Sequence, residues 1–180
     1  MVDEQEVTSE NPQGYIVSQS VEPGEMVGFG DTITIEVSKG PGEFVPNLVG
    51  YPLDQAEEFA TDNNLTIDSE EEYSNSDSNY VIDQSLISGT VFYPEEDTMH
   101  VTISLGMPFV SDMTGGSEGE FALMINEFNK ASAGLSYTVS KVGLSDEDKE
   151  AGLKSGMIKS QSISNEYTPI GSNIELVVYE

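Results

Sequence analysis

The chain has 180 residues and is strongly acidic, with 33 aspartates and glutamates against 6 lysines, no arginine and a formal net charge of −27. A surface of this sign repels the phosphates of nucleic acids and of anionic lipids, so we expect no nucleic-acid partner. The absence of cysteine excludes a disulfide framework and a thiol nucleophile. No apolar run is long enough to cross a bilayer.

Residues 1–41 are predicted to form three strands and no helix. The strands are expected at Val2–Val7, Tyr15–Ser18 and Thr32–Val37, with a tight turn at Glu22-Pro23-Gly24. We interpret this segment as a partial unit whose helix precedes Met1. A three-stranded sheet with one bare apolar face is marginal in water, so we expect residues 1–41 to fray or to self-associate with another copy.

Residues 42–107 contain every element of a complete unit. An apolar segment, Val45–Gly50, precedes a helix predicted for Leu53–Asn63, and a strand follows at Leu65–Glu71. The final strand alternates strictly, with Met99, Val101, Ile103 and Leu105 on one face. A shorter apolar strand, Tyr80–Ile82, is expected between them.

Residues 108–180 repeat this order with changes. Ser117 is the predicted N-cap of a helix that carries Phe121, Met124, Ile125 and Phe128 at helical spacing. The strand Tyr137–Val142 follows, and then a longer, acidic loop, Ser145–Ser155, which is expected to form its own helical turn. Three equivalent pairs mark the repeat along the whole chain: Gln19-Ser20, Gln84-Ser85 and Gln161-Ser162.

This ordered set of elements resembles the PASTA repeat of penicillin-binding proteins and serine/threonine kinases. The resemblance is carried by the Val45–Gly50 segment, the helix with Ala56 and Ala60, the Glu22-Pro23-Gly24 corner and the closing segment Val37–Pro41. It implies an α+β fold, a tandem array of small units that each pack one helix on a three-stranded β-sheet. The expected divisions are a partial unit at 1–41, a complete unit at 42–107 and a divergent unit at 108–180.

The divergent unit departs from the family pattern at two places. Ser111 stands where a proline is usual, and Asn165-Glu166 replaces the Pro-Gly turn. Its acidic loop also has no counterpart in the other two units.

The resemblance also implies a location and a function. Such repeats form the extracellular region of Gram-positive bacterial serine/threonine protein kinases, beyond one membrane-spanning helix, which would lie outside this sequence. The implied partners are peptidoglycan fragments (muropeptides), and β-lactams have also been proposed. Two alternatives stay open: the C-terminal region of a penicillin-binding protein, and a spacer array that binds little.

No catalytic group is predicted within the chain. The single histidine, His100, falls on the outward face of a strand, and no serine lies three residues before a lysine, so the acylating Ser-x-x-Lys motif is absent. Asp146-x-Asp148-x-Glu150 is superficially similar to a calcium loop, but Gly152 comes one place late and Met157 takes the place of the closing glutamate. We therefore expect a non-enzymatic segment without cofactor or metal, in a full-length protein that is a kinase.

The candidate ligand-binding residues are mainly aromatic. Each unit places an aromatic residue between the corner and the last strand, where a sugar ring can stack on it; the alternative is that these rings close the end of a small core. Polar side chains nearby can donate or accept hydrogen bonds. The predicted ligand-binding residues are Phe29, Gln84, Ser88, Phe92, Tyr93 and Tyr167.

Overall fold

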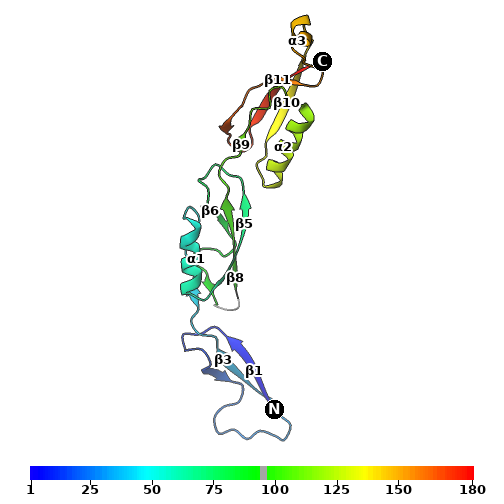
Figure 1. Cartoon of the computed structure of the whole chain (residues 1–180). Helices are drawn as coiled ribbons and strands as arrows, with labels where there is room; N and C mark the ends of the chain where they lie inside the picture. Colours follow the sequence, from blue (N-terminus) through cyan, green and yellow to red (C-terminus); the bar gives the residue numbers. More distant parts are fainter. Residues whose placement is uncertain (94–96) are drawn as a thin grey trace. The chain divides into compact units, whose positions relative to one another are not determined.

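The structure, a computed structural model, describes residues 1–93 and 97–180 (Figure 1). The chain divides into two compact units, one formed by residues 1–47, 57–67 and 85–99 and the other by residues 48–56, 68–84 and 100–180. Three small three-stranded sheets follow one another along the sequence, and we name them the first, second and third sheet. The boundary between the two compact units passes through the elements of the second sheet.

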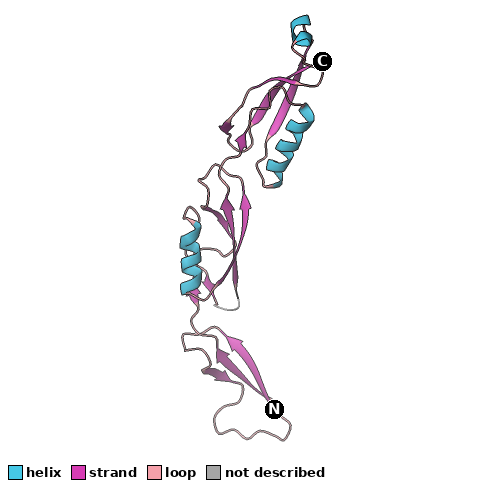
Figure 2. Cartoon of the chain, in the orientation of Figure 1, coloured by secondary structure: helices cyan, strands magenta, loops and turns pink. Residues whose placement is uncertain are grey.

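The first sheet has no helix beside it among residues 1–44, all of which the structure describes (Figure 2). It consists of β1 (Val2–Val7), β2 (Ile16–Gln19) and β3 (Ile33–Ser38) in the order β1-β3-β2. β3 pairs parallel with β1 and antiparallel with β2.

The second sheet has a helix along one side (Figure 2). Its strands run in the order β5-β8-β6, and β6 pairs antiparallel with β8. A separate two-stranded ladder joins β4 to β7. The elements are β4 (Glu43–Phe44), α1 (Leu53–Asp62), β5 (Thr66–Glu72), β6 (Val81–Gln84), β7 (Val91–Phe92) and β8 (Thr98–Ser104).

The third sheet repeats this arrangement. Its order is β10-β13-β11, with β13 parallel to β10 and antiparallel to β11, and a two-stranded ladder joins β9 to β12. The elements are β9 (Phe109–Val110), α2 (Glu118–Lys130), β10 (Ser136–Val142), α3 (Asp146–Glu150), β11 (Ile158–Gln161), β12 (Glu166–Tyr167) and β13 (Asn173–Tyr179).

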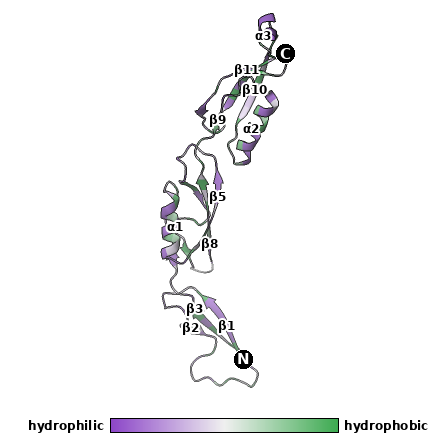
Figure 3. Ribbon diagram, viewed as in Figure 1, coloured by the Kyte–Doolittle hydropathy of each residue, from purple (hydrophilic) through white to green (hydrophobic). Residues whose placement is uncertain are grey.

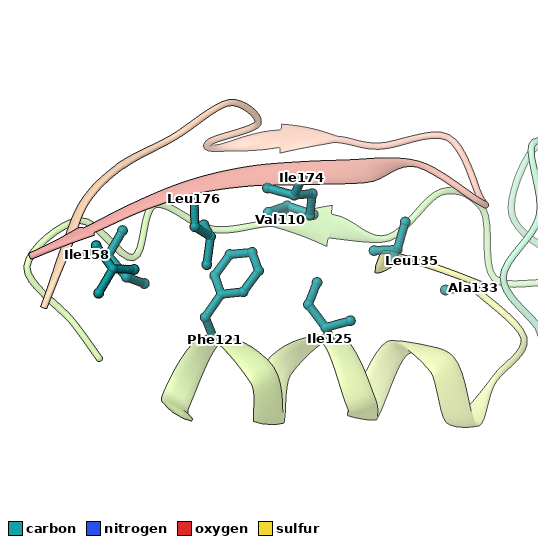
Figure 4. Packing of buried hydrophobic residues seen from close by; sticks show 9 residues of the cluster. Val110, Phe121, Ile125, Ala133, Leu135, Ile158, Ile174 and Leu176 are labelled. Atoms are coloured by element: carbon teal, nitrogen blue, oxygen red, sulfur yellow. The ribbon is translucent and has the colours of Figure 1, made fainter. Parts of the chain in front are cut away.

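The core of the third sheet lies between α2 and β13. Phe121 and Ile125 point from α2 toward Leu176 and Ile174 of β13 (Figure 4). The Phe121 ring is fully buried and meets the Tyr137 ring edge-on, with centroids 5.4 Å apart. Hydrophilic and hydrophobic residues are mixed along both α1 and α2 (Figure 3), as expected for helices that bury only one stripe. The predicted α+β class, with one helix on a three-stranded sheet, is confirmed.

A pair of buried hydroxyl groups closes the end of the second sheet, and we name it the serine clasp. The Ser74 and Ser104 hydroxyl oxygens are 2.6 Å apart, and the Ser104 hydroxyl also donates to the Ser76 carbonyl and accepts from the Gly106 N–H. The first sheet repeats the clasp. Its equivalents are Ser9, Ser38, Asn11 and Gly40.

The third sheet replaces the clasp by a tyrosine and an aspartate. Tyr179 occupies the end of β13, and its hydroxyl donates to Asp148 Oδ1 of α3 at 3.1 Å. Ser145 caps α3 and exchanges hydrogen bonds with the same aspartate. The long acidic loop therefore forms a helical turn, as predicted, and this turn is fixed to the sheet.

The first sheet exposes apolar side chains that the other two sheets do not. Val2 of β1 and Ile16 of β2 are exposed, whereas Met99, Val101 and Ile103 of β8 and Ile174, Leu176 and Val178 of β13 are buried. We expect the chain to self-associate reversibly through this face, because burying it removes apolar area from water. Sedimentation of the whole chain and of residues 42–180 measures the effect. If the whole chain and residues 42–180 are equally monomeric, the exposed apolar face of the first sheet is stable without a partner.

Candidate functional site

The ladder between β9 and β12 carries two exposed aromatic rings opposite each other. Phe109 and Tyr167 are register partners, and their rings meet edge-on, with centroids 5.2 Å apart and planes at 70°. Tyr167 is 67% exposed and Phe109 is 43% exposed, while the residue that follows each of them in the sequence, Thr168 or Val110, is buried. On β9 the alternation of the strand turns Phe109 toward solvent and Val110 into the core.

The ladder between β4 and β7 has the same arrangement with one ring fewer. Phe44 is 70% exposed and pairs with Val91, which is 40% exposed. Phe92, the next residue, is fully buried and meets Phe59 edge-on at 5.9 Å. The prediction that Phe92 contacts a ligand is therefore wrong for this structure, because its ring forms part of the core.

The other predicted aromatic residues lie in different surroundings. The Tyr93 ring is half-buried, its hydroxyl donates to the Thr8 hydroxyl, and the Lys39 ammonium lies 5.7 Å from its centroid, all within the first compact unit. Phe29 is fully exposed in the loop between β2 and β3. Phe29 and Tyr93 belong to the first compact unit, whereas Tyr167 belongs to the second.

Gln84 holds the chain segment in front of α1. Its Oε1 accepts from the Leu48 N–H at 2.7 Å, and Gln161 does the same for Met113 at 2.8 Å. A register shift in β6 and in β11 precedes each glutamine, which re-aims the side chain toward that segment. Gln84 thus has a structural role, whereas Ser88 is exposed on the loop before β7.

The acidic clusters do not form a metal site among the described residues, where no group of three or more His, Asp or Glu side chains is placed to hold an ion. His100 lies on the outer face of β8 with its Nδ1 3.3 Å from Asp68 Oδ2. Hydrogen bonds from the Ser145 hydroxyl and N–H lower the pKa of Asp148 below its ordinary value, and burial raises the pKa of Tyr179. Asp148 is therefore used to fix α3.

Phe109 is the residue that sequence reasoning missed. It precedes the buried Val110 directly, and the ladder that turns it outward is only two residues long on each strand. The sequence offered one signal: Phe109 and Val110 are consecutive apolar residues, and on a strand only one of them can face the core.

None of the helices in the described part of the chain has the length and hydrophobicity that a membrane span requires.

Several solved structures resemble the chain, among them the following two. The entire extracellular region of the Ser/Thr kinase PrkC from Staphylococcus aureus is 23% identical, with 98% of this chain and 61% of that chain covered and a TM-score of 0.45. The three-PASTA-domain of a Ser/Thr kinase from Staphylococcus aureus is 22% identical, with 99% and 85% covered and a TM-score of 0.46. The chain thus spans less than two thirds of the length of the first of these structures.

A family model also matches the chain directly. The model described as PASTA domain matches residues 1–39 and 43–105, which together are more than half of the sequence. The matched segments contain the first and second sheets with their serine clasps. The chain therefore belongs to the PASTA domain family.

Proposed function

We propose that this chain is an extracellular, cell-wall-sensing module that binds peptidoglycan fragments and belongs to a membrane-anchored bacterial serine/threonine protein kinase. The observation that carries the proposal is the match of the PASTA model to two consecutive segments. The membrane anchor and the kinase domain would lie in other parts of the protein. Three consecutive units, at 1–41, 42–107 and 108–180, form the binding region in this proposal.

The segment itself is non-catalytic, since PASTA domains are binding modules without catalytic activity. Its role in the kinase would be to convert the presence of wall fragments into a change in the rest of the protein. A β-lactam would bind here without covalent attachment, because the Ser-x-x-Lys nucleophile of transpeptidases is absent from the sequence.

Residues with exposed aromatic rings are best suited to contact peptidoglycan fragments. Tyr167 offers the largest accessible ring face among the predicted tyrosines, and Tyr93 is half-buried. Ser88, Gln84 and Phe29 stay in the proposal as neighbouring or separate contacts, whereas Phe92 is removed from it by its burial. The lack of arginine means that ligand carboxylates cannot be gripped bidentately.

Titration of the isotope-labelled chain with a purified muropeptide tests the proposal by NMR. We expect localised shift changes at Tyr167 or Tyr93 that saturate, because a stacked ring perturbs its nearest nuclei most. Amides of the buried core, such as those of Ile125 and Leu176, serve as the internal control and should stay unchanged. A spectrum without changes at millimolar muropeptide would favour the spacer function instead.

A further inference from the structure

We propose that the exposed pair Phe109–Tyr167 is a stacking subsite for the glycan part of a wall fragment, and that the chain holds neutral pyranose rings there instead of the stem peptide. This inference rests on the proposed function and adds which chemical part of the ligand is bound and where. Phe109 and Tyr167 are the contact residues.

The two rings are not required by the core beneath them. Val110, which follows Phe109 on β9, and Thr168, which directly follows β12, are buried, whereas Phe109 and Tyr167 are exposed. An edge-on aromatic pair contributes only about 0.5–1.5 kcal/mol beyond its buried area. The pair is therefore free to serve as a contact for a ligand.

The same register recurs on the other ladder of the chain. Phe44 precedes the buried Val45 as Phe109 precedes the buried Val110, and its partner on β7, Val91, is also exposed. Each ladder thus turns one aromatic ring and one further apolar side chain toward solvent. The β9–β12 ladder has a second ring at the position of Val91, which makes it the stronger stacking surface of the two.

The negative charge of the protein favours a neutral ligand at Phe109 and Tyr167. With a net charge of −27, the protein repels anionic ligands. The carboxylates of a stem peptide would meet this repulsion without any arginine to offset it. A neutral sugar meets none, and its C–H face is apolar enough to lie on an aromatic ring.

Polar groups for the sugar hydroxyls lie just beyond this ladder. The Asn165 Oδ1 accepts from the Asp112 N–H at 3.0 Å, which places these two exposed residues beside each other beyond the Val110–Glu166 pair. Asp112 also accepts from the Thr114 hydroxyl and N–H, and these bonds lower its pKa below the ordinary value. The carboxylate therefore stays ionised and suits hydroxyl donors.

Three probes distinguish the parts of the ligand: chitotetraose, a neutral N-acetylglucosamine oligomer; the free stem pentapeptide; and a complete muropeptide. We expect chitotetraose to shift the signals of Phe109, Tyr167 and Asn165, and the free peptide to leave them unchanged. Tyr167→Ala should weaken chitotetraose binding about tenfold, because one of two stacking faces is lost. Tyr167→Phe keeps the ring and should bind nearly as well as the unsubstituted chain.

Leu123→Ala is the matched control. Leu123 is an exposed apolar side chain on α2, 65% accessible, so its removal deletes similar surface area away from the ladder. It should leave chitotetraose affinity unchanged, and an unchanged thermal midpoint should show that each variant is folded. Mapping of the shifts on the unsubstituted chain does not depend on any variant.

Two results would overturn the inference. Muropeptide binding that the free peptide reproduces and chitotetraose does not, or that maps away from Phe109 and Tyr167, would refute this subsite while the proposed function stands. Silence with all three probes would refute both. Saturable shifts with chitotetraose that Tyr167→Ala weakens support both.

Discussion

The substitution Phe121→Ala is expected to unfold the third sheet together with α2. The Phe121 ring is fully buried between α2 and β13, and removing such a ring from a core costs about 3–5 kcal/mol. A unit of this size has a small core and a correspondingly small free energy of unfolding, so the loss is comparable to its total stability.

Urea unfolding followed by NMR measures this loss separately for each sheet. Signals of β10, β11 and β13 should broaden or collapse to unfolded positions without denaturant, while those of the first sheet stay dispersed. Leu123→Ala on the same helix is the control and should change the stability by less than about 0.5 kcal/mol, as exposed substitutions usually do. If the third sheet of the Phe121→Ala variant stays folded and its urea midpoint is nearly unchanged, the assignment of this core is wrong.

The substitution Ser104→Ala is expected to destabilise the second sheet by about 1–3 kcal/mol, although it removes a single oxygen atom. The Ser104 hydroxyl is buried and serves three partners: the Ser74 hydroxyl, the Ser76 carbonyl and the Gly106 N–H. Alanine leaves the buried Ser74 hydroxyl and the part-buried Ser76 carbonyl and Gly106 N–H without this partner. Unsatisfied buried polar groups are costly.

A double-mutant cycle isolates the serine clasp from the general cost of removing a hydroxyl. Ser74→Ala, Ser104→Ala and the double variant should give a coupling free energy of about 0.5–3 kcal/mol, because the two residues share one hydrogen-bond network. Ser38→Ala in the first sheet should behave like Ser104→Ala, since its hydroxyl has equivalent partners. Additive free energies would show that the two hydroxyls act independently.

The fold was predictable where a periodic pattern ran through many residues. The helical spacing of Phe121, Ile125 and Phe128 and the alternation through Met99, Val101 and Ile103 each require one face to be buried, and the structure buries that face. The N-cap at Ser117 was equally clear, because a serine three residues before Glu120 forms a capping box.

The candidate site was harder to predict because its elements are too short to carry a pattern. In a two-residue strand, nothing in the sequence distinguishes the buried Phe92 from the half-buried Tyr93 beside it. Phe109 was overlooked for the same reason. The roles of Gln84 and of the serine clasp depend on hydrogen bonds between residues far apart in the sequence, as between Leu48 and Gln84. Neither the composition nor a local sequence pattern predicts such pairs.

The anchoring of α3 by Tyr179 and Asp148 makes the third sheet a scaffold for protein engineering. None of the core residues described for this sheet lies between Gly143 and Met157, so this loop has accepted extra sequence without altering the packing of α2 on β13. The Tyr179 hydroxyl fixes the loop at α3 and the Gly156 N–H donates to the Tyr179 carbonyl, while Ala151, Gly152, Lys154 and Ser155 are exposed. A foreign peptide epitope grafted between Ala151 and Ser155 would therefore be displayed on a domain whose fold does not depend on it.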